Sequence, residues 1–239
     1  MSKKCEGCTW LWHPDCHRRH PSDPACRHFR PSKDDLRRLK ALDQALPNTS
    51  VEGWLGGLSY SQAFVVCIGA GPWKEGRRKK IQQMALDKLD SRDLSQVGQI
   101  DWYPLTWQNK MSSTLALHLA NAEKSMEEFC WDLIVESKAG SLWQRQRLYD
   151  ACGSSHGAKV LSLFCRDCLK IPSFPIDRHV KRQLEAFELP INETAMVILC
   201  NVAGLDPRRV AIKAVQAAFD GKSINPDWSS YNAQVSGSR

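Results

Sequence analysis

Apolar residues recur along this chain at the spacing of a helix face, and no segment shows the alternation that is typical of strands. A first helix is predicted to begin at Ser32, which can form a capping box with Asp35, and to end at Pro47. The apolar run at residues 63–71 is short and contains two valines, as a strand would. We interpret this run as a buried helix, because nothing near it alternates with a period of two.

Helical patterns continue along the rest of the chain. Residues 74–90 have the pattern of a basic amphipathic helix, and residues 91–110 that of an irregular connection. One helix is predicted over residues 111–139, with an apolar face formed by Leu115, Leu119, Ala122, Met126, Phe129 and Leu133. Further helices are predicted at 141–151, 157–169 and 177–188, and from Asp206-Pro207 to Gly221. The fold class predicted from these patterns is all-α.

Composition and charge narrow the class of partner. The chain has 239 residues, with 33 Lys and Arg against 26 Asp and Glu, which gives a formal net charge of +7. Basic clusters are spread over the whole length, as expected for a folded surface that follows a polyanion such as DNA. No apolar stretch reaches the roughly 20 residues of a membrane span, and no apolar signal segment is present, so we expect no membrane partner. The expected location is intracellular, which in a prokaryote means the cytoplasm, in association with the nucleoid.

Residues 1–30 form a distinct module that is rich in cysteine and histidine and has almost no aliphatic core. Thiols in an intracellular protein are kept reduced, so a disulfide framework is not expected. A CxxC pair followed by two more cysteines suits tetrahedral zinc, and the predicted ligands are Cys5, Cys8, Cys16 and Cys26. Histidine in place of one cysteine, or an iron–sulfur cluster in place of zinc, are the alternatives.

The segment with the clearest chemistry lies at residues 148–185. A turn rich in glycine and serine precedes a helix that begins near Lys159, and a proline-rich loop then leads to Asp177 at the start of the next helix. A turn that enters a helix N-terminus offers free backbone N–H groups to a phosphate. A lysine and a carboxylate at such positions suit a reaction in which a cationic sugar develops and an amine captures it. Taken one by one, the lysine is more often a surface charge and the aspartate a plain helix cap.

This segment resembles the helix-hairpin-helix–Gly/Pro…Asp superfamily of DNA glycosylases, which includes endonuclease III-like and 8-oxoguanine glycosylases. Residues 155–159 (SHGAK) fall on the Gly-Val-Gly-Arg-Lys portion of the family hairpin. Residues 175–182 (PIDRHVKR) fall on Pro-Val-Asp-Thr-His-Val-x-Arg. The eighteen residues from Lys159 to Asp177 match the family spacing. The resemblance covers about 40 residues and implies a two-lobed glycosylase fold.

The resemblance also implies a reaction on a nucleotide that is flipped out of the duplex into a pocket. Asp177 would stabilise the oxocarbenium-like sugar and assist deprotonation of the nucleophile. Lys159 would attack C1′ to form a Schiff base, after which β-elimination cleaves the strand. A protein without such a lysine would use water instead, so Lys159 is the argument for lyase activity.

Other residues are predicted to bind DNA. The hairpin residues Ser155, His156 and Gly157 would hold a phosphate, with a monovalent cation on the hairpin carbonyls. Arg178 stands where the family has threonine and would contact DNA or solvent. Gln62 resembles the family's wedge residue, which fills the gap left by the flipped base.

Two departures from the family pattern affect these predictions. Ser155 replaces the first hairpin glycine, and Gly153-Ser154 replaces the usual Leu-Pro. The four-cysteine iron–sulfur loop of endonuclease III relatives is absent, and Cys200 stands alone in that region.

The predicted organisation is a metal-binding module, an N-terminal helical lobe, a helix-hairpin-helix catalytic lobe, C-terminal helices and a tail, at residues 1–30, 31–110, 111–188, 189–225 and 226–239. The predicted function is a monomeric DNA glycosylase with AP lyase activity on double-stranded DNA. The expected base is an oxidised purine, or else a modified pyrimidine such as a modified cytosine of phage DNA, which would imply a defence role. The alternative is a non-catalytic DNA-binding protein that uses the hairpin and the zinc module for docking.

Overall fold

The computed structural model describes residues 29–46, 57–69, 83, 85–87, 89, 94, 108–142, 144–153 and 158–219. All regular elements within these residues are helices, which confirms the predicted all-α class for this part of the chain. The chain divides into two compact units. Unit 1 combines residues 1–51 with residues 174–239, and unit 2 is the continuous stretch 52–173. Among the described helices, none is long and apolar enough to span a membrane.

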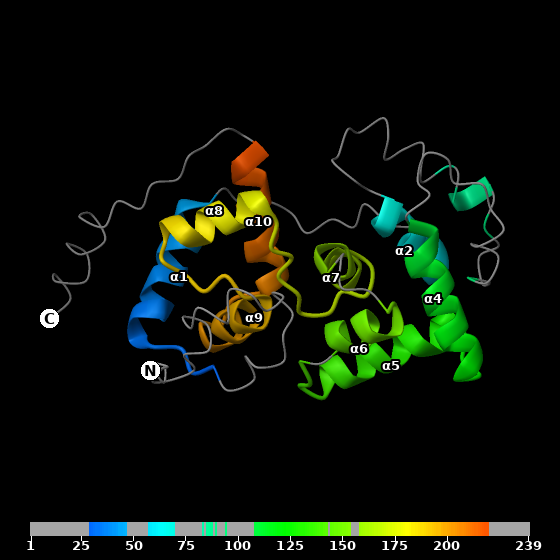
Figure 1. The fold of residues 1–239 in the computed structure, drawn as a ribbon. Coiled ribbons are helices and arrows are strands. Elements are labelled where there is room, and N and C mark those ends of the chain that lie inside the picture. Colours follow the sequence, from blue (N-terminus) through cyan, green and yellow to red (C-terminus); the bar gives the residue numbers. More distant parts are fainter. Residues whose placement is uncertain are drawn as a thin grey trace, which may run out of the picture. The chain divides into compact units, whose positions relative to one another are not determined.

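Of the described helices, unit 1 contains the first and the last three (Figure 1). Its helices are α1 (Lys33–Ala45), α8 (Arg178–Ala186), α9 (Glu193–Val202) and α10 (Pro207–Phe219). Helix α1 packs on α9, and α10 packs on both α8 and α9. The described core of this unit is apolar, with Leu39, Leu42, Leu184, Phe187 and Met196 each at most 1% exposed.

A buried ion pair joins the first and last helices of unit 1. The Nζ atom of Lys213 in α10 lies 2.6 Å from both the backbone oxygen and Oδ1 of Asp43 in α1. The Lys213 side chain is 4% exposed, so it donates to these oxygens away from water. Removing Asp43 from this pair is expected to destabilise the unit, because the buried Lys213 charge would lose its partner, whereas Asp43 is itself 26% exposed.

Unit 2 contains α2 (Tyr60–Gly69), α4 (Gln108–Asn121), α5 (Met126–Lys138), α6 (Gln144–Ala151) and α7 (Ala158–Asp167). Helix α7 packs against α2 and α6, and α2 also contacts α4 and α5. The rings of Phe64 and Phe164 meet edge to face with centroids 5.3 Å apart, which ties α2 to α7. The interpretation of residues 63–71 as helix is confirmed for the part that α2 covers.

The starts of α1 and α10 were predicted from their caps. Ser32 and Asp35 form the expected capping box at α1, and Oδ1 of Asp206 accepts the backbone N–H of Arg208 at the start of α10. Helices α6, α7 and α8 lie within their predicted ranges, which confirms them. Gly221 lies outside the described residues.

The single helix predicted over residues 111–139 is wrong. The chain turns between α4 and α5, and Glu123 adopts a positive φ of 51° in that turn. Ser125 then begins a new helix, because its hydroxyl accepts the N–H of Glu128 while the Glu128 carboxylate accepts the N–H of Ser125. These hydrogen bonds lower the pKa of Glu128. Ala122, predicted on the apolar face, is exposed in the turn.

Two other segments differ from prediction or lie outside the described residues. Helix α4 begins at Gln108, inside the segment predicted as an irregular connection. Of the helix predicted at residues 74–90, only residues 83, 85–87 and 89 are described, and 83 and 85–87 are helical. Helix α9 was expected only as an unspecified C-terminal helix, and Asn192 is its N-cap.

Candidate functional site

The predicted catalytic pair is divided between the two units. Lys159 is the second residue of α7 in unit 2, and Asp177 is the residue immediately before α8 in unit 1. The domain borders predicted from the sequence do not coincide with the unit borders, since the chain passes from unit 2 to unit 1 between Ser173 and Phe174. The functions assigned to the predicted domains stay predictions.

Asp177 is held by hydrogen bonds as the N-cap of α8. Its backbone is extended, with φ −100° and ψ −178°, and its Oδ1 accepts the backbone N–H groups of His179 and Val180, each at 2.8 Å. These amides are among the donors that have no partner inside the helix, and the helix dipole stabilises the carboxylate as the anion. The side chain is half-buried. The arrangement therefore presents a fixed negative charge at the end of a helix.

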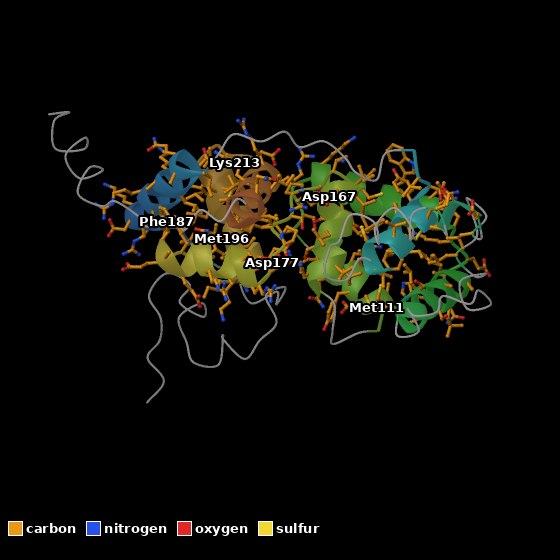
Figure 2. All side chains as sticks on the ribbon, turned by 90° about the horizontal axis from the view of Figure 1, so that it is seen from above. Met111, Asp167, Asp177, Phe187, Met196 and Lys213 are labelled. Atoms are coloured by element: carbon orange, nitrogen blue, oxygen red, sulfur yellow. The ribbon has the colours of Figure 1, made fainter. Side chains whose placement is uncertain are left out.

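The far side of α8 anchors this end in the core. Val180, Leu184 and Phe187 are each at most 1% exposed, which confirms the predicted inward face. Figure 2 shows Asp177 at one end of this helix and Phe187 at the other. Because the helix is fixed along its length, the position of its N-cap is fixed with it.

The loop before Asp177 is buried and bonded on both sides of the crossing between units. The Ser173 hydroxyl donates to the backbone oxygen of Ser162 in α7 at 3.0 Å, within unit 2. The Phe174 N–H donates to Oε1 of Glu193 in α9 at 2.9 Å, within unit 1. The Phe174 ring is fully buried, and Pro175 after it is also buried.

Lys159 lies in the first turn of α7, and its side chain is half-buried. The helix is anchored by Leu161, Phe164 and Cys165, each fully buried. Of the other residues predicted to point inward, Val160 and Cys168 are partly buried against this core. The helix thus fixes the backbone from which Lys159 extends.

The predicted phosphate cradle and metal module lie outside the described residues. This holds for Ser155, His156 and Gly157 of the hairpin, and with them the proposed monovalent cation. It also holds for Cys5, Cys8, Cys16 and Cys26, the predicted zinc ligands. These assignments stay predictions from the sequence.

The six described cysteines are free thiols: Cys67, Cys130, Cys152, Cys165, Cys168 and Cys200. Burial raises the pKa of Cys152 to about 12, and burial is also the main reason that the pKa of Cys168 is raised to about 12. Such thiols are poor nucleophiles and poor metal ligands in this state, because both roles need the thiolate. No group of metal-ligating side chains occurs among the described residues.

Gln62 occupies an internal position in unit 2. It is 6% exposed, its Nε2 donates to the backbone oxygen of Leu89 at 3.2 Å, and its Oε1 accepts the N–H of Ser59 at 3.1 Å. The first bond joins the start of α2 to the segment that contains Leu89, and the second lies within the start of α2 itself. A wedge role in DNA would require this side chain to leave both bonds.

Arg178 begins the exposed face of α8. Its Nε donates to Nε2 of His179 at 3.2 Å, and its side chain is exposed. Lys181 and Arg182, one turn further along, are exposed on the same face. Three cations therefore follow Asp177 on the surface of one helix.

Glu193 was not singled out from the sequence. It is 2% exposed at the first position of α9 and accepts the Phe174 N–H. The available signal was an acidic residue directly after the N-cap Asn192 and two residues before an apolar run, at a position where the helix dipole favours a negative charge. Its bond to a loop nineteen residues earlier has no local signature.

Comparison with known proteins yields no relative: no family model matches the chain, and neither a curated protein nor a solved structure is significantly similar to it.

Proposed function

We propose that this chain is a DNA glycosylase that removes a damaged or modified base and then cleaves the strand at the abasic site. The observation that carries the proposal is that the Asp177 carboxylate caps α8 and that Lys159, eighteen residues earlier in the sequence, lies in the first turn of α7. The two residues belong to different units, so their meeting at one nucleotide is part of the proposal. The net charge of +7 fits a DNA partner.

The proposed reaction assigns one role to each residue. The C1′–N bond of the flipped nucleotide breaks, and the base leaves with the bonding pair and gains a proton. The Asp177 carboxylate stabilises the positive charge that develops on the sugar. The Lys159 amine, deprotonated with the assistance of Asp177, bonds to C1′, and one of its protons moves to O4′ as the C1′–O4′ bond opens to give a protonated Schiff base. Loss of a C2′ proton then expels the 3′ phosphate, and water hydrolyses the Schiff base to release the enzyme.

The excised base is an oxidised purine or, second, a modified pyrimidine such as a modified cytosine of phage DNA. Pocket residues determine the choice of base, and they lie outside the segment that resembles the family. The order of the two expectations therefore follows the likeness to 8-oxoguanine glycosylases. Mass spectrometry of bases released from oxidised DNA and from phage DNA distinguishes the two.

A non-catalytic DNA-binding protein is the second candidate function. Capping accounts for Asp177 without any chemistry, because its Oδ1 accepts two backbone amides of α8. Lys159 is not a helix cap, and a cation in the first turn of a helix is disfavoured by the helix dipole.

Borohydride trapping on DNA with an abasic site tests the proposal. The wild-type chain is expected to form a covalent complex that Lys159→Ala abolishes. Lys138→Ala, which removes an exposed lysine at the end of α5 in the same unit, is expected to leave trapping unchanged. A wild-type chain that binds DNA but traps none of the abasic substrates supports the docking protein instead.

The N-terminal cysteines are proposed to hold one zinc ion per chain. Thiolate ligands and the short CxxC turn suit zinc, and a segment with so few aliphatic residues would need a metal in order to fold. Elemental analysis of the purified chain is expected to show zinc, and Cys5→Ser together with Cys8→Ser to lose it. Iron and sulfide in place of zinc would indicate the cluster.

A further inference from the structure

Glu193 is a buried carboxylate with a specific hydrogen bond outside its own helix. It is 2% exposed, and its Oε1 lies 2.9 Å from the backbone nitrogen of Phe174. Burying a carboxylate is costly unless it is hydrogen-bonded, so a residue of this kind needs a reason beyond packing. Its place at the first position of α9 offsets part of that cost through the helix dipole.

The amide that Glu193 binds lies three residues before Asp177. The Phe174 ring is fully buried, and Pro175 after it has a fixed φ and is also buried. Asp177 is itself fixed by its bonds to the α8 amides. The short run from residue 174 to residue 177 therefore has a fixed point at each end, and Glu193 supplies the first.

We propose that Glu193 is a positioning residue for Asp177, acting through the Phe174 N–H. The proposal rests on the function proposed above. Without the carboxylate, the loop loses its bond to α9, and Asp177 loses the fixed approach of its backbone. The Oδ atoms then sample a wider volume, while the helix cap itself can persist.

The neighbouring residue is consistent with this role. Ser173 bonds to the backbone oxygen of Ser162 in α7, the helix that carries Lys159. Consecutive residues at the crossing between units are thus tied to separate helices, one in each unit.

The test compares variants of Glu193 with a variant of its neighbour. Glu193→Ala removes the acceptor, whereas Glu193→Gln keeps an Oε1 that can accept the same N–H. Asn192→Ala removes the N-cap of α9, whose Oδ1 accepts the Ala195 N–H, and leaves Glu193 in place. It therefore serves as a control for loss of α9 stability alone.

Two measurements are made on the full chain: the single-turnover rate of covalent trapping on abasic DNA, and hydrogen exchange at the Phe174 amide. Glu193→Ala is expected to lower the trapping rate by on the order of 10²-fold, as misplacement of a reacting group by about 1 Å does. The affinity for the same DNA is expected to stay unchanged, so the loss falls on the rate and not on binding. Glu193→Gln is expected to restore most of the rate, and Asn192→Ala to lower the melting temperature with the rate kept.

Equal loss of rate in Asn192→Ala and Glu193→Ala would overturn the proposal, because general loosening of α9 would then explain both. If Glu193→Ala does not fold, Glu193→Asp carries the test, since it keeps the charge but shortens the side chain by one carbon. Slow trapping in this variant supports the proposal, and an unchanged rate overturns it.

Failure of the proposed function is recognised separately. A wild-type chain that never forms a trapped complex refutes the glycosylase–lyase proposal, and with it the role of Glu193 in that reaction. The exchange measurement still decides whether Glu193 fixes the Phe174 amide. Faster exchange at Phe174 in Glu193→Ala but not in Asn192→Ala supports this fixation, and unchanged exchange in Glu193→Ala rules it out.

Discussion

The first turn of α7 and the first turn of α8 each carry one residue of the proposed catalytic pair, and they differ in what holds that residue there. Asp177 precedes α8 as its N-cap and accepts two backbone amides, after a buried loop that is bonded to α9. Lys159 lies one residue inside α7, where a positive charge meets the positive end of the helix dipole. The carboxylate thus caps its helix, whereas the amine lies where the helix dipole disfavours a positive charge.

This difference determines which of the two residues gives the clearer test of catalysis. A variant of Asp177 changes a helix cap and any chemistry together, so its effect is mixed. Lys159 is not the cap of a described helix, so its variants leave the cap of α8 in place. Activity that depends on Lys159 is therefore stronger evidence for catalysis than activity that depends on Asp177.

The largest expected effect comes from Lys159→Gln. Strand cleavage at an abasic site and the borohydride-trapped complex are expected to be lost completely, because no amine remains to bond to C1′. The melting temperature is expected to stay the same or rise slightly, since a cation leaves the N-terminal turn. Gel separation of nicked DNA and a thermal melt measure the two. A large fall in melting temperature would show that Lys159 also supports the fold and would remove the contrast drawn above.

Asp177→Asn separates the cap from the charge. Asparagine caps helices as well as aspartate, so the melting temperature is expected to change little. The rate of base release is expected to fall by about 10²–10³-fold, as when one preorganised electrostatic contact is lost. Single-turnover kinetics on a duplex with the preferred base measure it. A full rate in this variant would mean that Asp177 serves only as a cap.

A smaller effect is expected from the cations on α8. Arg178→Ala and Arg182→Ala each remove one exposed charge next to Asp177. Each is expected to make the slope of log K against log salt for DNA binding shallower by about 1, with the effect uniform across sequences. Binding titrations at several salt concentrations measure the slope. Lys40→Ala, an exposed change on α1, is the control, and an equal change in it would argue against a specific phosphate surface on α8.

The smallest effect concerns stability alone. Asp177→Ala removes the cap of α8 and is expected to lower the free energy of unfolding by about 1 kcal/mol. Ser125→Ala removes the cap of α5 and is expected to cost a similar amount. Urea unfolding measures both free energies. A much larger loss for Asp177→Ala would indicate that the carboxylate stabilises the fold through contacts other than the cap.

The elements that were predicted from the sequence have local signals. Ser32 with Asp35, Asp177, and Asp206 before Pro207 are cap patterns that lie within a few residues of the helix that they start. The break at Ser125 has the same kind of signal, but the continuous apolar face from Leu115 to Leu133 masked it, because two helices in register resemble one long helix. The pattern of apolar residues alone does not reveal a turn of four residues.

Contacts distant in sequence could not be predicted in the same way. The bond from Phe174 to Glu193 and the pair of Lys213 with Asp43 join residues on separate elements, and no spacing rule relates them. The internal place of Gln62 depends on the segment that contains Leu89. The candidate site was therefore predicted only as far as its own short motif extends, and its supporting residues came from the fold.

The ion pair between Lys213 and Asp43 has a consequence for synthesis on the ribosome. Unit 2 is complete once residue 173 has emerged, so it can fold while the chain is still growing. Helix α1 precedes unit 2 in the sequence, yet its Asp43 meets Lys213 only after α10 has been made. Until then, the apolar face of α1 that contains Leu39 and Leu42 lacks its native contacts with the later helices of unit 1.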